Sequence, residues 1–172
     1  MTEKQPTVAS VAIKYGIAGG VIAVLYSAIL MIFGESTNKW LGFLSYLILV
    51  GAIVIAMQQF KRENEGYMSY GQGLGLGTLV ATIMGLLSGI FMVIYTTFID
   101  PDHFATIMDQ QRMELEERGM SDEQIDSALA IGESMSGPFT TLIMSIVGFA
   151  LIGLLLSLVI SAIMKKNRPQ FE

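Results

Sequence analysis

Four long stretches of the sequence, uncharged apart from Lys14 near the start of the first, constrain the fold more than any other feature. Each has about 19 residues or more, and a helix rising about 1.5 Å per residue needs about 20 residues to cross the roughly 30 Å hydrocarbon core of a bilayer. The sequence therefore predicts an all-α, polytopic membrane protein built as a bundle of four transmembrane helices. The predicted helices cover about residues 11–33, 40–59, 69–99 and 138–164.

The composition agrees with a membrane protein and removes several kinds of chemistry. Of the 172 residues, 52% are hydrophobic and 15% are charged, whereas an ordinary soluble domain has about 25% charged residues. The length suits a single domain, residues 1–172. Because the chain has no cysteine, disulfides, thiolate metal sites, cysteine nucleophiles and lipid attachment at cysteine are excluded.

The predicted third helix carries a small residue at every fourth position, and such positions stack on nearly one face of a helix. In a bilayer a row of this kind lets two helix backbones approach closely. We therefore expect the third helix to be the central packing element, with the first and fourth helices on its small face. The residues predicted to pack are Gly73, Gly77, Ala81, Gly85 and Gly89 in the third helix, Gly16 and Gly20 in the first, and Gly153 and Ser157 in the fourth.

Three glycines at alternate positions, Gly71, Gly73 and Gly75, open the same helix. Glycine weakens a helix because it loses more conformational freedom on folding than any other residue. A helix over residues 69–99 would be about 45 Å long, so we expect its first turns to tilt, bend or unwind and the three glycines to form a hinge. The run is not expected to bind nucleotide, since a phosphate-binding loop needs a preceding strand and a Gly-Lys-Ser/Thr sequence.

Lysine and arginine are distributed unevenly between the two sides of the predicted bundle. Seven lie on the side of both termini and three lie on the other side. Because cytoplasmic segments are enriched in these residues, we expect both termini in the cytoplasm and residues 100–137 outside. The seven are Lys4, Lys14, Lys61, Arg62, Lys165, Lys166 and Arg168, and the three are Lys39, Arg112 and Arg118.

The segment of residues 100–137 contains ten acidic and two basic residues, which give it a formal charge of −8. Its pattern predicts a hairpin of two short amphipathic helices. Asp100 would be the N-cap of the first helix and Gly119 would end it, whereas residues 121–124 are a capping box that opens the second. The hairpin is either a solvated lid on the bundle or a docking surface for a basic partner or a cation. The docking residues would be Glu114, Glu116 and Glu117.

Few residues offer catalytic or metal-binding chemistry. His103 is the only histidine, and one histidine without further ligands at helical spacing is weak support for a metal site. The apolar stretches carry hydroxyls but no charged residue in their central turns, where pumps and many transporters place ionisable groups. We therefore predict no catalytic, cofactor-binding or metal-binding residue. A neutral pore lined by hydroxyls is the remaining transport hypothesis.

Four motifs occur in a fairly specific order along nearly the full length of the chain. They are Tyr67-Met68-Ser69-Tyr70-Gly71-Gln72-Gly73, Tyr95-Thr96-Thr97-Phe98-Ile99-Asp100-Pro101-Asp102, Met120-Ser121-Asp122-Glu123-Gln124-Ile125 and Ile160-Ser161-Ala162-Ile163-Met164-Lys165-Lys166. In this pattern the chain resembles a bacterial family catalogued as domain of unknown function 4199. The resemblance implies a small four-helix integral membrane protein. We expect it to lie in the inner membrane of a bacterial cell. The resemblance implies no activity, so no catalytic residue is carried over.

The expected function follows from these predictions. We expect a non-enzymatic integral membrane protein that acts through helix packing with a membrane-protein partner or with a second copy of itself. The alternative is a small transporter or channel component that uses the glycines of the third helix as a hinge. The lipid bilayer is the expected surrounding, and no cofactor, nucleotide or nucleic acid is an expected partner.

Overall fold

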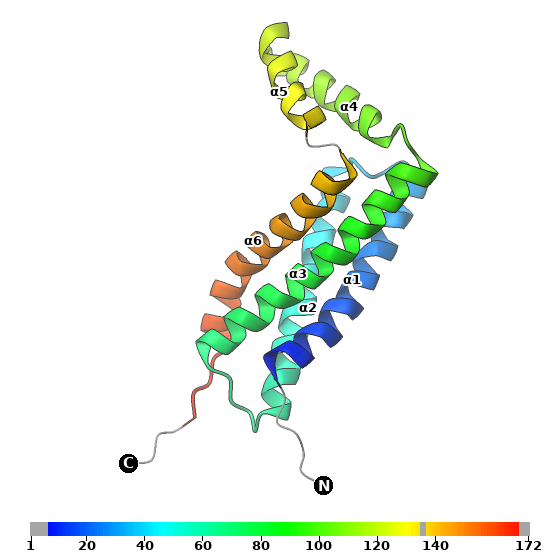
Figure 1. Cartoon of the computed structure of the whole chain (residues 1–172). Helices are drawn as coiled ribbons and strands as arrows, with labels where there is room; N and C mark the ends of the chain where they lie inside the picture. Colours follow the sequence, from blue (N-terminus) through cyan, green and yellow to red (C-terminus); the bar gives the residue numbers. More distant parts are fainter. Residues whose placement is uncertain (1–6, 135–136, 169–172) are drawn as a thin grey trace. The chain divides into compact units, whose positions relative to one another are not determined.

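The computed structural model describes residues 7–134 and 137–168, and most of these residues are helical (Figure 1). The helices are α1 (Val8–Ile32), α2 (Lys39–Glu63), α3 (Tyr70–Ile94), the π-helix η1 (Tyr95–Ile99), α4 (His103–Glu117), α5 (Asp122–Ser134) and α6 (Pro138–Met164). Four of the helical segments, α1, α2, α3 with η1, and α6, are long and apolar enough to cross a membrane. The prediction of an all-α fold with four long packed helices, and two shorter ones between the third and fourth, is confirmed. The chain is a multi-pass membrane protein.

The described residues form two compact units, and the division cuts across α3 and α6. Residues up to Ser88 and from Ser145 onward form one unit, which we call the bundle, whereas residues between Gly89 and Met144 form the other. The bundle contains α1, α2 and most of α3 and α6. The second unit contains the last residues of α3, the π-helix and the first residues of α6. It also contains α4 and α5, which together we call the hairpin.

Polar side chains join and terminate the first two helices of the bundle. The start of α1 is a capping box, in which Thr7 Oγ1 accepts from the Ser10 amide at 3.1 Å and Ser10 Oγ accepts from the Thr7 amide at 3.2 Å. Such caps satisfy amides that have no acceptor within the helix. The Tyr26 hydroxyl of α1 donates to the Leu41 carbonyl of α2 at 2.9 Å, so a hydrogen bond adds to the packing of these two helices.

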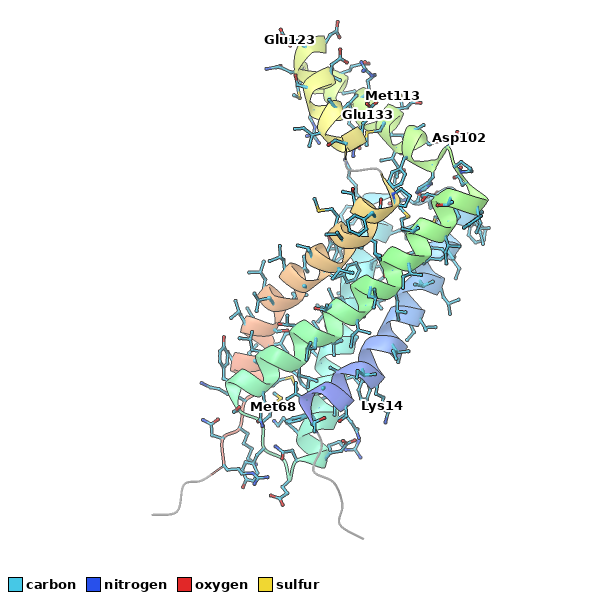
Figure 2. All side chains as sticks on the ribbon, viewed as in Figure 1. Lys14, Met68, Asp102, Met113, Glu123 and Glu133 are labelled. Carbon is cyan, nitrogen blue, oxygen red and sulfur yellow. The ribbon has the colours of Figure 1, made fainter. Side chains whose placement is uncertain are left out.

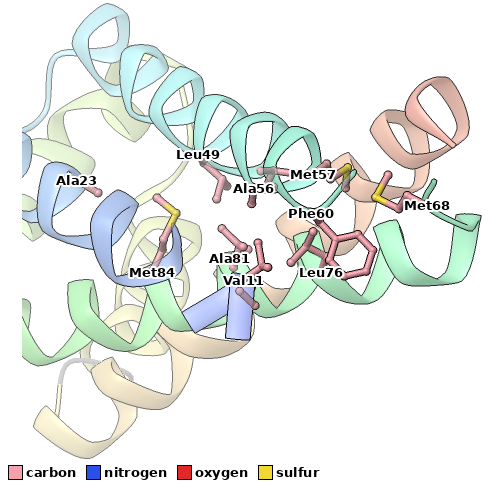
Figure 3. Close-up of a cluster of buried hydrophobic side chains, with 13 residues drawn as sticks. Val11, Ala23, Leu49, Ala56, Met57, Phe60, Met68, Leu76, Ala81 and Met84 are labelled. Carbon is pink, nitrogen blue, oxygen red and sulfur yellow. The ribbon is translucent and has the colours of Figure 1, made fainter. Parts of the chain in front are cut away.

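The apolar core of the bundle is concentrated in one half of α1 and α2. Both helices lie wholly within the described part of the chain, and α1 buries residues only within 11–23 and α2 only within 49–60. Figure 3 shows Phe60 of α2 beside Leu76 of α3, with Met68 in the same cluster. Lipid offers no hydrophobic drive between helices, so close packing stabilises this cluster.

The hairpin is held by contacts between its own two helices, whose side chains are drawn in Figure 2. Arg112 Nη2 of α4 lies 2.7 Å from Asp126 Oδ1 of α5, and this hydrogen bond raises the pKa of the Arg112 guanidinium. Met108 of α4 packs on Gly132 of α5, where an added Cβ would lie 2.7 Å from Met108 Cε. The predicted hairpin of two short helices is confirmed.

The boundaries of α4 agree with the prediction at one end only. Asp100 is not the N-cap, because its amide donates to the Tyr95 carbonyl at 2.9 Å and so closes the π-helix. α4 begins at His103, and Asp102 occupies the cap position without a side-chain hydrogen bond to the helix. The other end is as predicted. Gly119 follows α4 with a φ of +75°, a left-handed conformation that glycine adopts without steric cost.

Candidate functional site

The small residues of α3 pack directly on α6, and we call this contact the seam. Its pairs are Gly73 with Ser161, Gly77 with Ser157, Ala81 with Gly153 and Gly85 with Phe149. From one pair to the next, the position moves four residues forward along α3 and four residues back along α6, as expected for two antiparallel helices. A Cβ added to any of the four glycines in these pairs would come closer than 3.0 Å to a side-chain atom of the other helix. Gly89, the next residue in the row, is also buried.

α1 packs on α3 through its own glycines. A Cβ added to Gly16 would lie 2.8 Å from Ile83 Cβ, and one added to Gly20 would lie 2.6 Å from Leu87 Cδ1. The glycines of α1 therefore receive large side chains of α3. The expectation that the small face of α3 would receive both α1 and α6 is wrong for α1, because α6 occupies that face along the seam.

Two hydroxyls are enclosed in the seam. Ser157 and Ser161 are fully buried, and neither Oγ has a hydrogen-bond partner among the described residues. Each Oγ lies close to the place that a Cβ of the facing glycine, Gly77 or Gly73, would occupy, and so faces the Cα–H of that glycine. Weak Cα–H···O contacts of this kind recur between packed helices and contribute about 0.5–1 kcal/mol each. Both hydroxyls are therefore part of the helix packing.

The glycines predicted to form a hinge lie in regular helix. α3 is α-helical through Gly71, Gly73 and Gly75, so of the expected alternatives (a tilt, a bend or unwinding) the structure does not show unwinding. The physical reason is visible at Gly73, where contact with Ser161 in the seam offsets the conformational cost of glycine. An added Cβ would meet nothing within 4 Å at Gly71. Bending at these glycines stays a prediction.

The residues predicted to dock a partner lie at the end of α4. Glu114, Glu116 and Glu117 are all exposed. Glu114 Oε2 lies 3.6 Å from Arg118 Nη2, one helical turn away, and an exposed pair of this type contributes little to stability. The carboxylates of Glu116 and Glu117 stand on the same turn. Docking at these residues stays a prediction.

The only histidine lies where the π-helix meets α4. His103 is buried, and its Nδ1 lies 3.4 Å from Asp100 Oδ2. Its ring is edge-on to that of Tyr95, with 5.3 Å between the ring centroids. Within residues 7–134 and 137–168, no group of three or more histidine, aspartate or glutamate side chains is placed to hold a metal ion. The histidine therefore serves here as a contact between two helical segments.

A backbone pairing joins the loop between α2 and α3 (residues 64–69) to the tail that follows α6 (residues 165–168). Met68 and Lys166 exchange two backbone hydrogen bonds of 2.9 and 2.8 Å, which form an antiparallel β-bridge. Seen from the sequence, the loop and the tail are separate connections. In the structure they form a single feature at one end of the bundle, where Figure 2 labels Met68.

Two features of these sites were not predicted. Gly19 of α1 packs between α2 and α3, since an added Cβ would lie 2.8 Å from Ala52 Cβ and 3.0 Å from Met84 Sδ. The four-residue spacing of small residues predicted that Gly16 and Gly20 pack. It does not mark Gly19, which lies one residue before Gly20. The bridge between Met68 and Lys166 was also missed, because it joins distant residues and no local pattern marks either of them.

Comparison with known proteins identifies a family. The family model described as "Protein of unknown function (DUF4199)" matches residues 14–166, which is well over half of the chain. The resemblance seen in the sequence motifs is therefore confirmed. No curated protein and no solved structure matches the chain.

Proposed function

The chain belongs to the DUF4199 family of proteins of unknown function, and from this premise we propose that it is a non-enzymatic membrane protein that acts by binding a protein partner. The partner would carry a basic surface on the side of the membrane where the hairpin lies. The observation that carries this proposal is that the hairpin is folded by its own contacts and still exposes its acidic side chains. Charge complementarity of this kind guides association and selects partners.

Few basic residues neutralise the acidic side chains of the hairpin. Arg112 and Arg118 are its only basic residues, against ten acidic residues in the segment 100–137. Arg112 pairs with Asp126 and Arg118 pairs with Glu114, which leaves a large excess of negative charge. Like charges held on one small unit repel one another. A basic partner would relieve this repulsion.

Helix packing with a partner would have to use faces outside the seam. Gly73, Gly77 and Gly85 already contact α6 within the chain. By contrast, a Cβ added to Gly51 of α2 or to Gly148 of α6 would meet nothing within 4 Å. These two positions lie on faces where a second copy could approach, so self-association is the second form of binding to test.

The transporter alternative has less support. The hydroxyls of Thr78 and Thr82 donate to carbonyls one turn earlier in α3, both at 2.8 Å, and those of Ser157 and Ser161 are enclosed in the seam. These four hydroxyls of the membrane helices are therefore engaged in helix packing or in bonds to the helix backbone. The glycines proposed as its hinge lie in continuous helix.

The proposed orientation places both termini in the cytoplasm and the hairpin outside, in the inner membrane of a bacterium. It is supported by the seven lysine and arginine residues on the side of the termini against three on the other side. A reporter fused after Glu172 that is active only in the cytoplasm is the expected result. Activity of that reporter only outside the cytoplasm would contradict the orientation.

Crosslinking in native membranes tests the binding proposal. A double variant, Glu116→Gln with Glu117→Gln, should lose the main crosslinked neighbour of the wild-type protein. The matched control, Asp122→Asn with Glu123→Gln, removes the same charge from α5 and should keep that neighbour. An unchanged crosslinking pattern in the first variant would contradict docking at α4. A product of twice the mass of the chain would identify the neighbour as a second copy.

A further inference from the structure

A cavity of about 470 Å³ lies where the loop of residues 64–69 meets the tail of residues 165–168. Its lining includes Asn64, Tyr67, Ser69, Gln72, Lys166 and Arg168. We propose that this cavity binds the phosphate group of an anionic phospholipid. The proposal is independent of the function proposed above, because it concerns other residues at another part of the chain.

The two walls of the cavity are fixed by several contacts. The backbone bridge between Met68 and Lys166 joins the loop to the tail. Arg168 also reaches from the tail to the loop, with its Nη2 3.2 Å from both Asn64 Oδ1 and Glu65 Oε2. A site that is formed before its ligand arrives loses less conformational freedom on binding. The cavity is therefore a built feature of the bundle.

The positive charge in the cavity is only partly neutralised. Arg168 pairs with Glu65, whereas Lys166 Nζ lies 5.4 Å from the centroid of the Tyr67 ring. In the part of the chain that the structure describes, no carboxylate forms an ion pair with Lys166. The described lining of the cavity contains no aspartate or glutamate. An ammonium group in such surroundings favours an anion.

The first turn of α3 adds hydrogen-bond donors to the cavity. The Ser69 amide donates to Gln72 Oε1 at 2.8 Å, and the Gln72 amide donates to Ser69 Oγ at 3.3 Å. These bonds use oxygen acceptors and leave the Gln72 side-chain NH₂ and the Ser69 hydroxyl as donors. Phosphate oxygens accept several hydrogen bonds, and the start of a helix further favours negative charge. Together with Lys166, these groups suit a phosphate.

The position of the cavity favours a lipid as the source of the phosphate. Its walls adjoin the ends of α3 and α6, which are long and apolar enough to cross a membrane, so the cavity lies at the level of the headgroups. Tyr67 in its lining is of a residue type enriched at that level. The exposed Val159 and Ile163 in the last turns of α6 provide apolar surface for acyl chains. Basic pockets between membrane helices bind anionic headgroups by the same chemistry.

Lipid binding to the purified full-length chain, measured by native mass spectrometry in detergent, tests the proposal. The wild-type protein should retain phosphatidylglycerol more strongly than phosphatidylcholine, which carries the same phosphate but whose choline ammonium would be repelled by Lys166. Lys166→Met should weaken phosphatidylglycerol binding about tenfold, since it removes a charge-assisted hydrogen bond. Lys165→Met is the matched control, because it removes the same charge from the neighbouring residue, which does not line the cavity. Its binding should stay within about twofold of the wild type.

Several results would overturn the proposal. Equal loss of binding in the two lysine variants would show diffuse attraction to the basic end of the chain. Equal retention of phosphatidylcholine would show that the headgroup charge is not recognised. Displacement of phosphatidylglycerol by inorganic phosphate at millimolar concentration would assign the cavity to a soluble phosphate compound.

A second variant guards against a folding defect in Lys166→Met. Gln72→Glu keeps an oxygen acceptor for the Ser69 amide and places a carboxylate in the cavity, so it should abolish phosphatidylglycerol binding. The unfolding temperature of each variant in lipid-free detergent should match that of the wild type. Normal phosphatidylglycerol binding by a folded Gln72→Glu variant would contradict the proposal.

Discussion

Ser157 Oγ of α6 occupies the space that a Cβ on Gly77 of α3 would take. The same glycine is also approached by α2, since its added Cβ would lie 3.0 Å from both Ile53 Cγ2 and Met57 Cε. Three helices therefore meet at one residue that has no side chain. Additional volume at Gly77 would therefore press on two neighbouring helices at once.

Gly77→Ala is expected to destabilise the bundle by about 1–3 kcal/mol, because the new methyl group has no space. Gly77→Leu and Gly85→Leu should lower the yield of folded protein sharply for the same reason. Unfolding in detergent, followed by circular dichroism or by size-exclusion chromatography after heating, measures both effects. Gly51→Ala and Gly148→Ala are the matched controls, because an added Cβ meets nothing within 4 Å at either position. Equal stability of all five glycine variants and the wild type would contradict close packing at the seam.

The contact between Ala81 and Gly153 can be tested by swapping the two residue types. Gly153→Ala alone should be destabilising, because its new Cβ would collide with the Cβ of Ala81. The double variant Ala81→Gly with Gly153→Ala keeps one methyl group at the same contact and should recover most of the loss. Residues in contact typically show coupling energies of about 0.5–3 kcal/mol in such cycles. Strictly additive effects in the unfolding measurement would show that the two residues are not neighbours.

Packing rather than ion pairing is expected to stabilise the hairpin. Ile125 is fully buried, and Ile125→Ala should cost about 2–5 kcal/mol. Arg112→Ala removes an exposed pair with Asp126 and should change stability far less. Hydrogen exchange of the α4 and α5 amides measures both. Faster exchange after Arg112→Ala than after Ile125→Ala would reverse this assignment.

The turn between α4 and α5 depends on a left-handed residue. Gly119 has a φ of +75°, and a Cβ in that conformation costs about 1–2 kcal/mol. Gly119→Ala should therefore speed hydrogen exchange at the ends of α4 and α5. Gly119→Asn should have a smaller effect, since asparagine tolerates this conformation better than alanine does. Identical exchange rates for the two variants would contradict the expected role of the conformation.

The long helices could be predicted because their cause is local. α6 begins at Pro138 and ends at Met164, as predicted, because proline and the first lysine of the tail bound an uninterrupted apolar run. α2 continues to Glu63, beyond the predicted end near residue 59. The prediction there used the limit of the membrane span, whereas helical hydrogen bonding continues into the charged turn. Gly119 was also predictable, because a single residue determines the conformation at a helix end.

The remaining features depend on contacts between distant residues, which no local pattern shows. The glycines at the start of α3 suggest a weak helix, and the packing of Gly73 on the distant Ser161 is not visible in the local pattern. The spacing of small residues indicated which faces pack but not which partner each face receives, so Ile83 and Leu87 were not expected against α1. The start of α4 was predicted too early. The π-helix, which the amide of Asp100 closes, occupies the preceding residues, so α4 begins only at His103.

The bridge between the loop and the tail follows the same antiparallel register as the seam. Met68 lies five residues before Gly73, and Lys166 lies five residues after Ser161, its partner in the seam. The pairing of the tail therefore depends on the length of α6. One residue inserted between Ser161 and Met164 would turn everything beyond it by about 100° around the helix axis, and Lys166 would leave the cavity. The length of α6 therefore determines whether the ammonium group of Lys166 lies in the cavity.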